Sequence, residues 1–146
     1  MPQSVGDRAA AELEIRNVLA RLAQLADSGD TDEYVSLLTE DIVWAMPPNP
    51  SIGLAASERR GHEEIATGQR QRMEARHQGP GSNTMHTVST TSITLDGDDS
   101  ATARSAFAYW GDTATVPTVH SMGRYLDTFR RTEGGWKLAR REITFG

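Results

Sequence analysis

The chain has 146 residues, a net charge of −5 and no cysteine. This length suits one domain with its own core, and the missing cysteine excludes disulfide frameworks, thiol catalysis and cysteine-ligated zinc. Because the charge argues against a nucleic-acid partner and no apolar run suits a signal peptide or membrane span, we expect a cytoplasmic single domain over residues 1–146.

Two helices are predicted in the first quarter of the chain. Apolar residues recur at helical spacing between residues 5 and 26, which predicts an amphipathic helix. Ser28-Gly29 is typical of a helix C-terminus. Asp30 begins a short second helix, and Glu33 three residues later completes the D-x-x-E pattern of a capping box.

The rest of the chain predicts one short strand, one helix and a run of long strands. "DIVWAM" (41–46) predicts the short strand, the Pro- and Gly-rich residues 47–61 predict a loop, and 62–78 predict a polar, Arg-rich helix. The long strands are expected over 84–95, 101–110, 116–131 and 136–145. Helices followed by an antiparallel meander indicate an α+β fold, with helices packed on one face of a curved sheet.

Asp27 has no evident structural role between the first two helices, whereas Asp30 is explained by capping. A carboxylate in the last turn of a helix lies near carbonyls with partial negative charge, which disfavours it by about 0.3–1 kcal/mol. Asp27 is therefore either a solvated residue at a helix end or the acceptor of a specific hydrogen bond in a pocket.

Four histidines are candidate partners for Asp27. His62 and His77 lie at the two ends of the predicted third helix, where exposure or the helix dipole explains them. His86 and His120 lie in predicted strands, where a side chain can point inward. A carboxylate that holds one imidazole nitrogen leaves the other as a base near neutral pH. That arrangement suits elimination, dehydration or isomerisation without a metal or cofactor.

Other catalytic arrangements have little support in the sequence. It contains no HxH or HExxH spacing, no G-x-S-x-G elbow, no P-loop and no G-x-G-x-x-G. Lys137 is the only lysine, so the chain has almost no amine available to form a Schiff base. By strict alternation, Arg141 shares one face of the last strand with Lys137, Ala139 and Ile143. It is either a salt-bridged edge residue or a group that stabilises a leaving anion or enolate.

Four segments of the chain resemble the SnoaL-like family of the nuclear transport factor 2-like superfamily. They are "ADSGDTDEYVSLLTEDIVW", "RGHEEI", "HTVSTTSITLDGDDSATARS" and "MGRYLDTFRRTEGGWKLARREI", of which the last is the most specific. The resemblance covers residues 8–145. It implies a cone-shaped α+β fold, in which three N-terminal helices cover a curved mixed sheet and enclose an apolar pocket.

Two enzymes of this fold, scytalone dehydratase and γ-hexachlorocyclohexane dehydrochlorinase, are similar to the chain in site layout. Both use an Asp near the end of the first helix with a His at the start of a long strand, and Asp27 and His86 occupy those positions. Arg141 follows Trp136 at the spacing of an active-site Arg in the dehydrochlorinase. The resemblance also implies a substrate-binding pocket that includes Tyr125, Trp44 and Phe107.

Other positions depart from these two enzymes. Leu22 stands where the dehydrochlorinase has a catalytic Lys, and Ala26 stands where the dehydratase has a tyrosine. The region of Gly111 lacks the second histidine of the dehydratase. The base can therefore be carried over, but the residues that specify either reaction cannot.

These observations together predict a cofactor-free and metal-free lyase or isomerase that acts on a small apolar cyclic compound. His86 would be the general base, Asp27 would orient it, and Arg141 and Tyr125 would contact polar substrate atoms. A non-catalytic small-molecule-binding protein and a structural subunit of an oxygenase are the alternatives. We also expect a homo-oligomer, a dimer or a trimer, because one helical layer cannot cover the broad sheet formed by residues 116–145.

Overall fold

Three helices and a six-stranded sheet make up the computed structural model, which describes residues 4–48, 50, 53 and 55–146. The elements are α1 (Val5–Ser28), α2 (Thr31–Ser36), β1 (Leu38–Met46), β2 (Ser57–Arg60), α3 (Gly61–Glu74), β3 (Met85–Leu95), β4 (Ser100–Gly111), β5 (Thr118–Thr132) and β6 (Gly135–Phe145). The strand order is β2-β1-β6-β5-β4-β3, and only the β1–β6 pair is parallel. The fold is therefore α+β with a mixed, curved sheet, as the resemblance implied. Among the described helices, none is long and apolar enough to cross a membrane.

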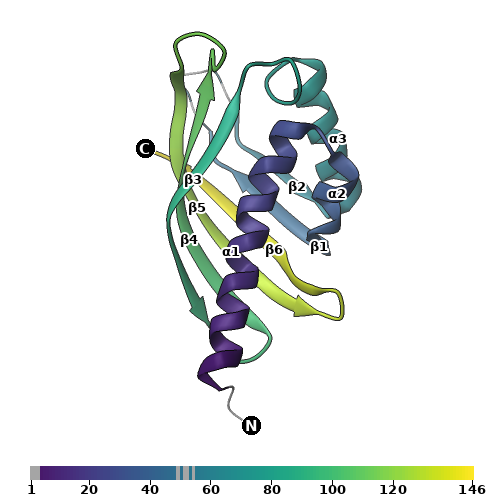
Figure 1. The fold of residues 1–146 in the computed structure, drawn as a ribbon. Coiled ribbons are helices and arrows are strands. Elements are labelled where there is room, and N and C mark those ends of the chain that lie inside the picture. The colour runs from purple at the N-terminus through teal and green to yellow at the C-terminus, as the bar shows by residue number, and fades with distance from the viewer. Residues whose placement is uncertain (1–3, 49, 51–52, 54) are drawn as a thin grey trace.

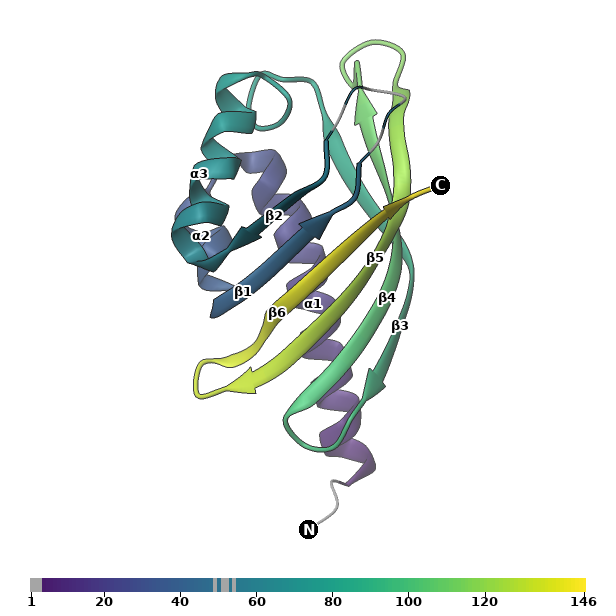
Figure 2. The ribbon, with the colours of Figure 1, turned by 180° about the vertical axis from the view of Figure 1, so that it is seen from behind.

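Helix α1 runs across one face of the sheet, with α2 and α3 beside β1 and β2 (Figure 1). The opposite face of β4, β5 and β6 carries none of the described helices (Figure 2).

Gly29 ends α1 in the left-handed conformation, with φ of 84°, and its N–H donates to the Leu25 carbonyl at 2.9 Å. Asp30 caps α2 by accepting the Glu33 N–H at 3.0 Å, while the Glu33 carboxylate pairs with Arg21. The predicted N-cap is confirmed. The second hydrogen bond of a capping box, from the Asp30 N–H to the Glu33 side chain, is replaced by the ion pair between Glu33 and Arg21.

The main apolar core lies between the helices and the inner face of the sheet. Burial of one large apolar side chain stabilises a fold by about 1.5–3 kcal/mol. The largest fully buried apolar members of this core are Ile15, Leu22, Leu25, Leu38, Ile42, Ile65, Phe129 and Leu138. A second, smaller cluster contains Phe107, Tyr125 and Ile143. Members of both clusters line the cavity of the candidate site, so the core also forms its walls.

Three predicted boundaries in the first half of the chain are wrong. Residues 57–60 form the edge strand β2, not part of a loop, and pair with β1. Their sequence "SERR" is entirely polar, because an exposed edge strand needs no apolar face. Residues 49, 51, 52 and 54 of the predicted loop lie outside the described residues. Strand β1 begins at Leu38 instead of residue 41, and α3 ends at Glu74 before Arg76 takes a left-handed φ of 59°.

A β-bulge in β6 overturns the predicted alternation of its faces. Phe129 of β5 pairs with Leu138, whereas Thr128 pairs with Arg140, so Ala139 is an extra residue. Side chains are buried on both sides of the bulge, namely Trp136 and Leu138 before it and Arg141 and Ile143 after it. Strict alternation predicted that Arg141 shares a face with Lys137 and Ala139. The bulge makes this prediction wrong, and Arg141 lies on the same buried face as Leu138.

Candidate active site

A cavity of about 700 Å³ lies between α1, α3 and the inner face of the sheet. This volume is within the usual range for small-molecule sites, about 300–1,000 Å³. The three residues predicted for a substrate pocket, Trp44, Phe107 and Tyr125, all line it. The Phe107 and Tyr125 rings stack with centroids 4.5 Å apart. Part of the wall is therefore a stacked aromatic surface against which a largely apolar ligand can pack.

Asp27 and His86 meet where the last turn of α1 faces the start of β3. Asp27 Oδ1 lies 2.9 Å from His86 Nδ1. The same carboxylate accepts the backbone N–H of His86, at 3.1 and 3.2 Å from its two oxygens. The side chains are 23% and 13% exposed, respectively. The predicted contact between a partly buried Asp27 and the His86 ring is confirmed, while its catalytic role stays a prediction.

The contact with Asp27 determines which nitrogen of His86 is basic. A carboxylate accepts a proton-bearing Nδ1, so the neutral ring carries its lone pair on Nε2. No hydrogen bond to Nε2 is found within the described part of the chain. The ring lines the cavity and lies 5.1 Å from the Tyr109 ring, centroid to centroid. This geometry presents an oriented base to a ligand.

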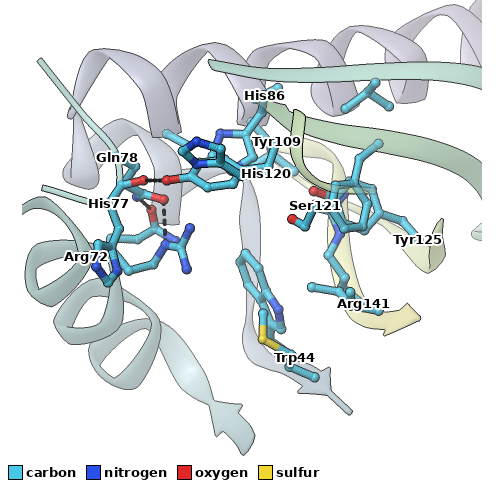
Figure 3. Close-up of a pocket in the computed structure, with 18 of the residues that line it drawn as sticks. Trp44, Arg72, His77, Gln78, His86, Tyr109, His120, Ser121, Tyr125 and Arg141 are labelled. Carbon is cyan, nitrogen blue, oxygen red and sulfur yellow. Dashed lines mark hydrogen bonds between the residues drawn. The ribbon is translucent and has the colours of Figure 1, made fainter. Parts of the chain in front are cut away.

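Tyr109 stands between two of the histidines at the cavity wall. Its hydroxyl donates to the backbone carbonyl of His77, and burial raises the pKa of Tyr109, so the phenol stays neutral (Figure 3). The His120 ring approaches Tyr109 edge-on at 5.7 Å. A Cβ added at Gly111 would lie 2.0 Å from His120 Cε1. The small residue at position 111 therefore makes room for a histidine from the neighbouring strand.

A polar network between α3 and the segment that follows it forms another part of the wall. Arg72 Nε donates to Gln78 Oε1 at 2.7 Å, and Gln78 donates in turn to Gln69 (Figure 3). The Arg72 guanidinium lies 6.0 Å from the centre of the Tyr109 ring. Burial lowers the pKa of Arg72, since its partners are mostly neutral. Sequence reasoning missed this network, because nothing in an Arg-rich helix marks which arginine faces inward.

Arg141 and Asp127 form a closed ion pair across β5 and β6. Arg141 Nε and Nη2 each donate to one Asp127 oxygen at 2.9 Å, and the two side chains are 5% and 0% exposed. Burial by itself lowers the pKa of Arg141, but the Asp127 carboxylate beside it raises that pKa above its ordinary value. The guanidinium also lies 3.7 Å from the Tyr125 ring centre.

The ion pair resolves the alternatives for Arg141 in part. It is salt-bridged, but β6 lies in the middle of the sheet and not at an edge. Asp127 was not singled out from the sequence. Its position between Tyr125 and Phe129, on the same face of β5, is the signal that could have found it, because a carboxylate on an apolar face needs a cationic partner.

The remaining donors do not form a metal centre. Within the described residues, no three His, Asp or Glu side chains converge as ligands. His62 is not among the cavity residues, and its Nε2 lies 2.9 Å from the Leu38 carbonyl oxygen. His62 therefore joins the start of α3 to β1 and has a structural role.

Comparison with known proteins supports the fold assignment. The family model of the SnoaL-like domain matches residues 7–142. A nuclear transport factor 2-like protein with a cystatin-like fold from Novosphingobium aromaticivorans is 27% identical over 98% of this chain and 90% of its own, with a TM-score of 0.75. A proposed scytalone dehydratase from the same organism is 19% identical over 98% and 89%, with a TM-score of 0.79.

A structure of LinA shares the fold at a TM-score of 0.75, with 15% identity over 96% of this chain and 88% of its own. No curated protein matches the chain in sequence. Identities of 15% and 19% establish a common fold and no common activity. The match of the family model over almost the whole chain shows that the protein belongs to the SnoaL-like domain family, within the nuclear transport factor 2-like superfamily.

Proposed function

We propose that the protein is a cofactor-free lyase or isomerase that removes a proton from a small, largely apolar cyclic compound. The observation that supports this most strongly is the 2.9 Å contact between Asp27 and His86 Nδ1 at the wall of a 700 Å³ cavity. It supports a role for Nε2 as an oriented base at a cavity lined by aromatic side chains. The other cavity histidine near a carboxylate, His120, lies 3.9 Å from Asp112, beyond hydrogen-bond distance.

The proposed reaction begins with the substrate lying against the aromatic wall. His86 Nε2 takes a proton from a carbon next to an activating group, so a C–H bond breaks and an N–H bond forms. Asp27 holds the Nδ1–H and stabilises the resulting imidazolium. The electron pair left on carbon then expels a leaving group, which gives elimination. Alternatively, the proton returns at another carbon, which gives isomerisation.

Arg141 has a narrower role in this proposal than a free cation would have. Nε and Nη2 are occupied by Asp127, while Nη1 takes no part in that pair. Arg141 also packs against the Tyr125 ring, and both residues line the cavity. We therefore assign Arg141 and Tyr125 to contacts with polar substrate atoms, with the charge of Arg141 largely compensated.

A screen in deuterated water tests the proposed function. Purified protein is incubated with a panel of cyclic ketones, hydroxylated rings and halogenated rings, and each compound is analysed by mass spectrometry. We expect loss of water or halide, or deuterium at carbon, for at least one class. Compounds that bind to the protein, yet come back unlabelled and unchanged, would contradict proton abstraction.

A binding protein without catalysis is the second candidate, and two cavity residues favour it. Leu22 and Ala26 line the cavity at the positions where the two similar enzymes are expected to carry a Lys and a Tyr. Without those polar groups, a bound compound has fewer partners for charge that develops during a reaction. In this case, His86→Ala would leave ligand affinity nearly unchanged and no compound would turn over.

We also propose a homo-oligomer that forms through the outer face of the sheet. No described helix covers that face of β4, β5 and β6 (Figure 2). Met122 of β5 and Met85 of the neighbouring β3 are 58% and 48% exposed, and burial of such side chains favours association. Size-exclusion chromatography with light scattering at micromolar concentration should give a dimer or trimer, and a monomer would contradict the proposal.

A further inference from the structure

The cavity has a charge bias that the proposed proton transfer does not use. Among the described residues that line it, Arg59, Arg72 and Arg141 are the arginines and none is Asp or Glu. The whole chain nevertheless has a net charge of −5. The described cavity lining therefore includes three arginines and no carboxylate, although the chain as a whole is acidic.

The three arginines differ in how their charge is compensated. Asp127 neutralises Arg141 through two hydrogen bonds. In the described part of the chain, no carboxylate lies within ion-pair distance of Arg72 or Arg59. Arg72 uses only Nε, to the neutral amide of Gln78, which leaves the donors of Nη1 and Nη2. Arg72 is partly buried, and a partly buried charge with only neutral partners is unfavourable until an anion compensates it.

Arg59 adds a second positive charge close to Arg72. A Cβ added at Gly68 of α3 would lie 2.6 Å from Arg59 Cζ, so the Arg59 guanidinium lies across α3 at that glycine. Gly68 and Arg72 are four residues apart and share one face of the helix. Two like charges on one face repel each other, and an anion bound beside them removes that repulsion.

We propose that the cavity recognises a cyclic carboxylic acid, whose carboxylate is held by Nη1 and Nη2 of Arg72. Two parallel N–H donors match the two oxygens of a carboxylate, which favours this planar group over other anions. Arg59 increases the positive potential, and the apolar body of the ligand lies against the aromatic wall.

The position of Tyr109 connects this subsite to the proposed base. The Arg72 guanidinium and the His86 ring lie 6.0 and 5.1 Å, respectively, from the centre of the Tyr109 ring. Arg72 and His86 therefore both border Tyr109 at the cavity wall, so a compound held at Arg72 can extend toward the proposed base. The acid group anchors the compound and does not react. This inference relies on the proposed function only in taking the cavity as the place where substrate binds.

Calorimetric titration with naphthalene-2-carboxylate and its neutral amide, naphthalene-2-carboxamide, tests the subsite. A charge-assisted pair outweighs a neutral hydrogen bond by about 1–1.5 kcal/mol, so the carboxylate should bind about tenfold more tightly. Arg72→Gln should remove this preference, so that the carboxylate and the amide bind with about equal affinity. Arg70→Gln should keep it, because Arg70 is exposed on the same helix, 4.0 Å from Asp32, and does not line the cavity.

Two further variants separate recognition from folding and from catalysis. Arg72→Lys keeps the charge without the fork, and should retain part of the preference even if Arg72→Gln proves unstable by circular dichroism. Asp27→Asn should keep the full preference while losing any turnover, so a failure of the proposed chemistry leaves this result intact. The proposal is overturned if wild-type protein binds neither probe, binds both equally, or keeps its preference in Arg72→Gln.

Discussion

Two side chains that line the cavity, Arg141 and His86, are each held by a carboxylate, and the two pairs differ in which atoms they leave free. Asp127 and Arg141 are sealed, with exposures of 0% and 5% and two parallel hydrogen bonds. Asp27 and His86 are 23% and 13% exposed, and the ring keeps Nε2 without a partner among the described groups. The Asp127–Arg141 pair is buried like other interior ion pairs, whereas the Asp27–His86 pair leaves Nε2 of His86 available to a ligand.

The difference follows from the position of each pair in the fold. Asp127 and Arg141 lie opposite each other on two central strands, so the sheet closes around them. Asp27 lies in the last turn of α1 and His86 at the start of β3, so this pair joins the helical layer to an edge strand of the sheet. Removal of one partner from a buried pair leaves an uncompensated charge in the interior, whereas the proposed proton transfer needs a pair with one nitrogen accessible to a bound compound.

Removal of Asp127 should have the largest effect on stability. Asp127→Ala leaves the Arg141 guanidinium buried without its counter-charge, which should lower the free energy of unfolding by about 3–5 kcal/mol. Urea unfolding followed by tryptophan fluorescence measures the change. The double variant Asp127→Leu with Arg141→Met should recover most of it. A loss under about 1 kcal/mol in the single variant would show that the pair is not sealed.

Asp27→Asn should reduce turnover while leaving the fold in place. The amide oxygen can still accept the His86 backbone N–H, but the imidazole loses the anion that orients it and stabilises its protonated form. We expect kcat/KM to fall by about 10²–10⁴-fold on any substrate found in the screen. Circular dichroism serves as the control for folding. An unchanged kcat/KM would place Asp27 among ordinary helix-end residues.

Asp30→Ala separates the two aspartates at the helix junction. Asp30 accepts the Glu33 N–H at 3.0 Å and is the N-cap of α2. Its loss should cost about 0.5–2 kcal/mol of stability, with little direct effect on kcat. Thermal unfolding and turnover are measured on the same preparation. A large drop in kcat with unchanged stability would reverse the roles assigned to Asp27 and Asp30.

The exposed pair of Asp41 and Arg130 should show the smallest effect. The hydrogen bond from Arg130 holds the pKa of Asp41 below its ordinary value. A carboxyl with a lowered folded-state pKa stabilises the fold at neutral pH, and this contribution disappears as the pH falls through that pKa. Asp41→Asn should therefore cost less than about 1 kcal/mol at neutral pH. Urea unfolding in strong acid should show no difference between variant and wild type, and a persistent difference there would rule out the ion pair as its cause.

Local signals in the sequence predicted the helices well, because caps and helical periodicity act over a few residues. Gly29 and Asp30 are such signals. The inward face of β6 could not be predicted from alternation, because the extra residue Ala139 is defined only by pairing with β5. One indication of the bulge was present in the sequence. Trp136 and Ile143 are both large and apolar, yet they stand an odd number of positions apart, so strict alternation would place them on opposite faces, and the structure buries both.

The candidate site was predictable only where a family resemblance supplied pairs of distant residues. Asp27 and His86 are 59 positions apart, and no local pattern joins them. Arg72 had no such precedent and lies among other arginines of a polar helix, so only the structure shows that it faces the cavity. Long-range partners depend on the packing of α1 and α3 on the sheet, which residue spacing does not encode.

The most direct test of proton abstraction by His86 compares wild-type protein with His86→Ala in deuterated water. The compound is the one that the screen identifies, and deuterium at carbon is followed by NMR. His62→Ala is the control, since His62 lies outside the cavity residues and contacts the Leu38 carbonyl. We predict labelling or elimination by wild type and His62→Ala, and a loss in His86→Ala at least as large as in Asp27→Asn. Labelling by folded His86→Ala at the wild-type rate would contradict the account.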